Sequence, residues 1–205
     1  MKTFRNFVEN KENKMLLIMR GTPSSGKSFA AKKLAQETGG VIFSTDDQFG
    51  TDPEEYRTNI SKAIADNKMG HYHMLNQMKA IEAMKSGKSP IIIDNTNTTR
   101  SECAPYFFAG KKFGYEVKFV EPSDVKSPWV QLGIPEILKT KDPDKLQLAA
   151  SKLASKSKET HNVPQDAILK MLTRFEPEPK PEDFNDPNLT KYIHPNIKKE
   201  LGLGE

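Results

Sequence analysis

The sequence has few of the residues that crosslink a protein or anchor it in a membrane. Cys103 is the only cysteine among 205 residues, so the chain can form neither an internal disulfide nor a thiolate zinc site. The longest uninterrupted apolar run, Met15–Met19, has five residues, whereas a membrane-spanning helix needs about 20. This run is also too short for the core of a secretory signal peptide, and no small-residue cleavage site follows it. We therefore expect a cytoplasmic protein without a membrane segment.

Charge is distributed unevenly along the chain. The net charge is +4, but residues 176–205 hold seven acidic and four basic residues, so the preceding 175 residues carry +7. A basic body suits anionic partners such as nucleotides or nucleic acid, although many ordinary domains share this balance. Residues 176–205 also contain five of the 14 prolines and little hydrophobic periodicity. We expect this acidic, Pro-rich tail to be extended or disordered, which would leave it free to bind another protein.

Short apolar segments alternate with helical patterns in the first two thirds of the chain. The expected strands are Met15–Arg20, Val41–Phe43, Pro90–Ile93 and Tyr115–Val120. The expected helices are Lys27–Thr38, Tyr72–Lys85 and a segment from Thr99 to about Phe113. This alternation predicts an α/β fold with three layers, in which helices cover both faces of a parallel sheet. Ligands of such folds bind beyond the carboxyl ends of the strands.

A phosphate-binding motif connects the first expected strand to the first expected helix. Residues 21–28 match G-x-x-x-x-G-K-[ST], and a strand before and a helix after are the context that this P-loop motif requires. Its glycines let backbone N–H groups turn toward phosphate oxygens, and the helix N-terminus adds a positive dipole end. Lys27 is expected to reach the terminal phosphates of ATP, and Ser28 to bind Mg²⁺. The residues expected to contact the nucleotide are Gly21, Thr22, Pro23, Ser24, Ser25, Gly26, Lys27, Ser28 and Phe29.

Acidic residues follow the second and third expected strands. Asp46, with Asp47 beside it, comes after Val41–Phe43, where a carboxylate could accept the proton of an attacking hydroxyl. Asp94 follows Pro90–Ile93, where it could help to orient Mg²⁺ and its waters. Aspartate is also common at turns and helix caps, so a purely structural role remains an alternative for each.

Residues 123–160 combine several prolines with an excess of lysine and show no clear hydrophobic period. We expect a mobile helical lid here, followed by an amphipathic helix over Pro164–Phe175. Lys156 and Lys158 either cover the triphosphate or form a solvated helix face, and the residues alone leave both open. Trp129 is either a base-stacking residue or a hydrophobic anchor.

Together these motifs resemble those of the polynucleotide-kinase-like P-loop ATPases. That group contains phage-type polynucleotide 5′-hydroxyl kinases, kinase-like domains of eukaryotic adaptor relatives and related AAA-type ATP-binding domains. The segments that carry the resemblance are Gly21–Ser28, Ser44–Asp47, His73 with Asn76 and Gln77, Ile91–Asn97 and the helix near Pro164. We therefore divide the chain into an N-terminal appendage (1–14), a P-loop kinase domain (15–175, with its lid at 123–160) and the tail (176–205).

The resemblance implies transfer of the γ-phosphate of ATP to a nucleic-acid 5′-hydroxyl, with Asp46 as the general base. Two departures from the pattern stand out. Phe49 occupies the position at which phage-type kinases carry an arginine that holds the substrate phosphate. The lid carries Lys156 and Lys158 where the relatives carry arginines. Lysine supplies charge without the bidentate fork of arginine, so this lid is expected to stabilise the transition state more weakly or in a different arrangement.

We predict an ATP- and Mg²⁺-dependent phosphotransferase that acts on polynucleotide 5′-hydroxyl ends. The expected catalytic residues are Asp46, Lys27, Lys156 and Lys158, and the expected Mg²⁺ ligands are Ser28 and Asp94. Two other functions remain open at this point. One is a P-loop kinase for a small metabolite or sugar nucleotide, and the other is an ATP-binding adaptor module that transfers no phosphate.

Overall fold

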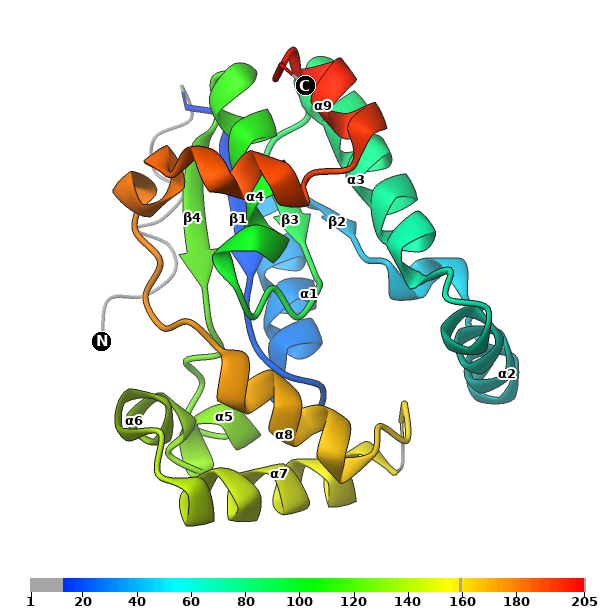
Figure 1. Cartoon of the computed structure of the whole chain (residues 1–205), viewed down its shortest axis with the longest axis vertical. Coiled ribbons are helices and arrows are strands. Elements are labelled where there is room, and N and C mark those ends of the chain that lie inside the picture. Colours follow the sequence, from blue (N-terminus) through cyan, green and yellow to red (C-terminus); the bar gives the residue numbers. More distant parts are fainter. Residues whose placement is uncertain (1–12, 159, 205) are drawn as a thin grey trace.

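Four short parallel strands form the centre of the structure, a computed structural model that describes residues 13–158 and 160–204. They are β1 (Met15–Met19), β2 (Val41–Phe43), β3 (Ile91–Ile93) and β4 (Glu116–Val120), in the sheet order β2-β3-β1-β4. All three pairings are parallel, which confirms the expected α/β fold (Figure 1). The expected N-terminal appendage, apart from its last two residues, lies outside the described residues.

Helices cover both faces of this sheet. Alternate side chains of β1 point to opposite layers: Leu16 and Ile18 belong to one apolar cluster, and Leu17 belongs to another. The first layer is built by α3 (Met69–Lys85) and α4 (Arg100–Lys112), and the second by α1 (Lys27–Thr38) (Figure 1). Because both faces of β1 are buried, this strand is a continuous apolar run and shows no alternation of polar and apolar residues.

One helix was not anticipated by the sequence analysis. Helix α2 (Pro53–Ala65) follows a single 3₁₀ turn, η2 (Asp46–Gln48), and stands to one side of the sheet (Figure 1). The Asp52 carboxylate caps it by accepting the backbone N–H groups of Glu54 and Glu55 at 2.9 and 3.0 Å. An aspartate followed by proline and two glutamates is a typical helix start, and this signal would have located α2.

Four helices form a lobe with its own apolar core beyond the carboxyl ends of the strands (Figure 1). This lid lobe (residues 128–175) consists of α5 (Pro128–Gln131), α6 (Ile134–Thr140), α7 (Pro143–Ser157) and α8 (Gln165–Arg174). The apolar core of this lobe therefore includes α8, whereas the sequence predicted that this helix follows the lid. Trp129 is fully buried and its ring lies 5.3 Å from that of Phe175, so it is a hydrophobic anchor and offers no exposed surface for base stacking.

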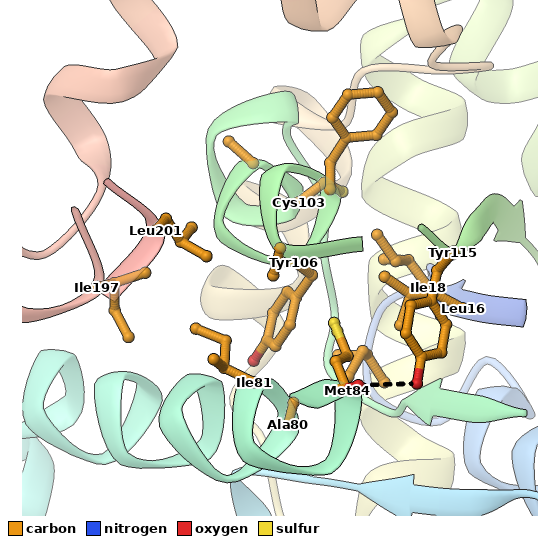
Figure 2. Packing of buried hydrophobic residues seen from close by; sticks show 14 of the residues in the cluster. Leu16, Ile18, Ala80, Ile81, Met84, Cys103, Tyr106, Tyr115, Ile197 and Leu201 are labelled. Atoms are coloured by element: carbon orange, nitrogen blue, oxygen red, sulfur yellow. Dashed lines mark hydrogen bonds between the residues drawn. The ribbon is translucent and has the colours of Figure 1, made fainter. Parts of the chain in front are cut away.

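The C-terminal segment is folded, and the expectation of an extended or disordered tail is wrong. Its elements are η3 (Pro181–Asn185), η4 (Pro187–Tyr192) and α9 (Pro195–Leu201). Phe184 stacks on Phe107 of α4 with ring centroids 4.1 Å apart. Figure 2 shows Ile197 and Leu201 beside Ile81 of α3, in the same cluster. Single apolar residues on very short helices between prolines produce no periodic pattern, and for this reason the sequence analysis missed them.

The buried face around α3 and α4 also contains polar groups that are satisfied internally. The Tyr115 hydroxyl lies 3.2 Å from the Met84 carbonyl oxygen and 2.6 Å from that of Lys88, which ties β4 to the end of α3 (Figure 2).

Among the described residues, no helix is both long enough and apolar enough to span a bilayer.

The packing of the C-terminal segment predicts that it contributes to stability. Ile197 is fully buried, so Ile197→Ala should lower the free energy of unfolding by about 2–5 kcal/mol because it leaves a cavity. Tyr192, in the same segment, is 69% exposed, and Tyr192→Ala should change it by less than about 0.5 kcal/mol. Urea unfolding of the two variants measures both values. Equal effects of the two substitutions would contradict the packing described here.

Candidate functional site

The P-loop (residues 21–28) leaves the end of β1 and runs into the first turn of α1, between the ends of β3 and β4. Gly26 precedes α1 with φ +93°, a conformation that strongly favours glycine. A Cβ atom at Gly26 would also lie 3.1 Å from the Ser127 Cβ. The Gly21 N–H donates to the Thr96 carbonyl oxygen at 3.0 Å, which fixes the start of the loop to the segment after β3.

Several polar groups of the P-loop have no partner within the described part of the chain. The side-chain oxygens of Thr22, Ser24 and Ser25 are buried and make no hydrogen bond there. No side chain caps the N-terminus of α1 either. A buried polar group without a partner costs about 1–3 kcal/mol, and an anion that accepts several hydrogen bonds would remove this cost. The loop therefore fits a phosphate group, as its sequence motif implies.

An ion pair joins the P-loop to the end of β3. The Lys27 ammonium contacts Asp94 Oδ1, and each residue is 8% exposed. The region in which we expect Mg²⁺ to bind thus contains Asp94 and the exposed Ser28 at the start of α1. No cluster of three or more potential metal ligands exists among residues 13–158 and 160–204. Proteins usually hold Mg²⁺ with one or two protein groups together with the phosphates of the nucleotide.

Asp46 lies at the same edge of the sheet, after β2. The Ser44 hydroxyl donates to the Asp94 carbonyl oxygen at 3.0 Å and accepts the Asp46 N–H at 3.3 Å, so it connects the two acidic segments. Asp46 is exposed, and its Oδ1 accepts a hydrogen bond of 3.2 Å from the Tyr56 hydroxyl of α2. An exposed carboxylate near a phosphate-binding loop can bind a second substrate and take up its proton.

A network of polar side chains fixes the backbone before Asp46. The Thr45 N–H donates to Asn95 Oδ1 at 3.0 Å, and the Thr45 hydroxyl lies 3.0 Å from His73 Nδ1. Burial lowers the pKa of His73, so the neutral imidazole is favoured. Asn76 and Asn95 both donate to the buried Tyr106 hydroxyl at 3.0 Å. These hydrogen bonds orient the start of the loop between β2 and α2.

The sequence analysis missed the role of Arg20, the residue between β1 and the P-loop. Arg20 is fully buried and donates to the carbonyl oxygens of Asn97 and Thr98 at 3.0 and 3.2 Å. It also pairs with Glu121 at 3.2 Å, and its guanidinium lies 4.5 Å from the centre of the Phe175 ring. In the sequence, Arg20 looks like the polar last residue of a strand. Only the structure shows that its side chain joins the sheet to the lid lobe.

The lid lobe is also attached to the P-loop itself. The Trp129 backbone N–H donates to the Ser25 carbonyl oxygen at 3.2 Å, and its indole N–H donates to Glu121 at 3.3 Å. Lys156 and Lys158, in contrast, are exposed, and the ammonium group of neither makes a hydrogen bond or ion pair with another described residue. Phe29, on the first turn of α1, is 67% exposed. The structure thus brings Lys27, Asp94 and Asp46 to one sheet edge but does not bring the two lid lysines to them.

A family model identifies the group to which this arrangement belongs. Residues 16–178 match the family AAA_33, described as an AAA domain, over more than half of the chain. The chain belongs to this AAA domain family. The family includes polynucleotide-kinase-like domains, so the expected relationship to that group is confirmed. As a P-loop AAA domain, the protein is expected to bind a nucleotide, typically with Mg²⁺.

A curated relative of this AAA domain is human NEDD4-binding protein 2. The two sequences are 41% identical over 109 residues, which cover 53% of this chain and 6% of the relative. The match therefore concerns one small part of a much larger protein. It supports the family relationship without transferring the activity of the whole relative.

The geometry of the P-loop predicts a specific sensitivity at Gly26. Gly26→Ala should weaken ATP binding about tenfold or more, because a side chain disfavours φ +93° and crowds Ser127. Gly39→Ala, at the other end of α1, is the matched control: its φ is +71° but nothing lies within 4 Å of the added Cβ. That control should lose stability and retain ATP affinity. Isothermal titration with ATP and Mg²⁺ measures both, and equal affinities of the two variants would refute the prediction.

Proposed function

We propose that the protein is a phosphotransferase that moves the γ-phosphate of ATP to an acceptor hydroxyl, and that the acceptor is a polynucleotide 5′-hydroxyl. The observation that carries the proposal is the position of Asp46. An exposed carboxylate, oriented by Tyr56 and linked through Ser44 to Asp94, lies at the sheet edge that holds the P-loop. A protein that only binds ATP has no need for a general base at an accessible position.

Each residue has a distinct role in the proposed reaction. Lys27 and the P-loop N–H groups bind the β- and γ-phosphates, while Ser28 and Asp94 hold Mg²⁺, which neutralises charge on the phosphate oxygens when bound. Asp46 accepts the proton of the acceptor hydroxyl. The acceptor oxygen then forms a bond to the γ-phosphorus as the bond between that phosphorus and the β,γ-bridging oxygen breaks, and ADP leaves with that electron pair.

The Lys27–Asp94 pair prepares the site for this reaction. A buried ammonium needs a counter-charge, and Asp94 supplies it next to the P-loop. When ATP and Mg²⁺ are bound, the γ-phosphate would give Lys27 a counter-charge and Asp94 would help to hold the metal.

The polynucleotide acceptor is favoured by the family relationship and by the net charge of +7 on the first 175 residues. Phe49 is fully buried between α2 and α3, so it packs inside the protein and leaves the phosphate-binding position of phage-type kinases without a cation. We propose that Lys156 and Lys158 supply charge instead, which requires the lid lobe to move toward the P-loop. A small metabolite or sugar nucleotide is the second candidate acceptor, and the buried Phe49 favours an acceptor that needs no cation at this position.

An adaptor function without phosphate transfer is the third candidate, and it is supported by the name of the human relative, a NEDD4-binding protein. The folded tail weakens this candidate. Its apolar side chains Phe184, Leu189 and Ile197 are used in the core of this chain, so they are not free to bind a partner.

Two substitutions separate ATP binding from phosphate transfer. Asp46→Asn should lower the transfer rate about 10²–10⁴-fold while ATP binds normally, because the general base is lost and the P-loop is intact. Lys27→Ala should remove transfer and also weaken ATP binding. Lys33→Ala, which removes an exposed lysine of the same helix, is the control and should do neither. Near-normal transfer by Asp46→Asn would show that the base has been assigned wrongly.

A panel of acceptors identifies the substrate. We expect labelled γ-phosphate to appear on 5′-hydroxyl oligonucleotides and not on oligonucleotides that already carry a 5′-phosphate. Label on small metabolites alone would favour the second candidate. Tight ATP binding without any labelled acceptor would favour the adaptor.

A further inference from the structure

We propose that Tyr56 is a positioning residue for Asp46, and that His161 of the lid lobe holds Tyr56 in place. The catalytic consequence rests on the proposed function, whereas the positioning itself can be tested without phosphate transfer. The juxtaposition links the exposed carboxylate after β2 to the segment between α7 and α8, about 100 residues later in the sequence.

The first step of the argument is the contact between Tyr56 and Asp46. The Tyr56 hydroxyl donates to Asp46 Oδ1 at 3.2 Å, and no other described side chain bonds to this carboxylate. The ring of Tyr56 is 8% exposed, so a rigid, buried group orients an otherwise exposed acid. Oδ1 already accepts this hydrogen bond, so Oδ2, which accepts no hydrogen bond from a described side chain, keeps both lone pairs available for the proton of an acceptor.

The second step concerns the protonation of Tyr56. Burial raises the pKa of the Tyr56 hydroxyl, and the charge of Asp46 together with the hydrogen bond raises it further. The hydroxyl therefore keeps its proton near neutral pH and remains a donor. A donor of this kind fixes the orientation of Asp46 and does not compete with it for the proton of the acceptor.

The third step is the support of the Tyr56 ring. Phe49 packs edge-on against it with centroids 6.0 Å apart. The His161 ring also contacts Tyr56, with its centroid 4.7 Å away and the two rings at an angle of 54°. The neighbouring residue Arg57 donates to the Thr160 carbonyl oxygen at 3.4 Å, so two successive residues of α2 contact two successive residues of the lid lobe.

The arrangement of the elements explains why this contact matters. Figure 1 shows α2 to one side of the sheet, with the segment between α7 and α8 extending toward it. Helix α2 packs its inner side on Phe49 and Tyr72, whereas the hydroxyl of Tyr56 faces the Asp46 turn. Without His161 the Tyr56 ring loses one of its two aromatic contacts, Phe49 being the other, and its hydroxyl is held less firmly against the carboxylate. The lid lobe thereby acts on the proposed base through Tyr56.

Kinetics of three variants and one control test the catalytic part. Tyr56→Phe keeps the ring and removes the hydroxyl, and should lower kcat about tenfold or more with little change in the KM for ATP. His161→Ala should also lower kcat, and His161→Phe should restore it because the ring is retained. Tyr192→Phe removes a hydroxyl from an exposed tyrosine far along the chain and should have no effect.

A combination of variants separates this coupling from two independent effects. If His161 acts through the Tyr56 hydroxyl, His161→Ala should have little additional effect in the Tyr56→Phe background. Fully additive losses in the double variant would overturn the coupling. A raised KM for ATP with unchanged kcat in Tyr56→Phe would overturn the positioning role.

A spectroscopic measurement decides the positioning part even if no acceptor is ever phosphorylated. The ¹³Cγ resonance of Asp46, identified by its loss in Asp46→Asn, should shift in Tyr56→Phe and in His161→Ala, and should return toward the wild-type position in His161→Phe. An unchanged resonance in Tyr56→Phe would overturn the inference whatever the kinetics show. A shifted resonance in a protein that transfers no phosphate would retain the positioning and refute the proposed function alone.

Discussion

The buried guanidinium of Arg20 is the interaction on which the arrangement of the site depends. A charge without access to solvent must be paired and hydrogen-bonded, since an uncompensated buried charge costs several kcal/mol. Its partners come from three separate regions: the loop after β3, Glu121 after β4, and the end of the lid lobe at Phe175. Satisfying one side chain therefore draws these regions together directly below the P-loop.

The polar contacts of the site continue outward from this point. The P-loop is fixed by Thr96 at one end and contacted by Trp129 at the other, and Lys27 is paired with Asp94 between them. Ser44 then extends the network from Asp94 to Asp46. Phosphate-binding groups and the proposed base are thus parts of one continuous hydrogen-bonded edge. The lid lobe contacts the P-loop end of this edge through Trp129, and it reaches the Asp46 end indirectly, through the contact of His161 with Tyr56.

Local sequence patterns were sufficient wherever the structure is local. The P-loop, the four strands and the cap of α4 each depend on residues close together in the chain, and the structure contains all of them; Thr99 accepts the Glu102 N–H at 3.3 Å as the capping pattern implies. Arg20, Tyr56 and the C-terminal segment were missed because their partners lie far away in the sequence. Arg20 contacts Phe175, and Tyr56 contacts His161. The two residues of each pair are so far apart in the sequence that no periodic pattern reveals the contact. The two lid lysines were assigned from the excess of lysine and from the positions at which the relatives carry arginines, and neither determines where a side chain points.

Trp129 can serve as a fluorescent probe of the site. The sequence contains a single tryptophan, and that residue is buried with its backbone hydrogen-bonded to the P-loop and its indole N–H on Glu121. All indole fluorescence of the molecule consequently originates next to the loop that is expected to receive the triphosphate. The protein carries an intrinsic optical label at this place, so changes in the lobe that accompany a bound nucleotide can be followed in the unmodified chain.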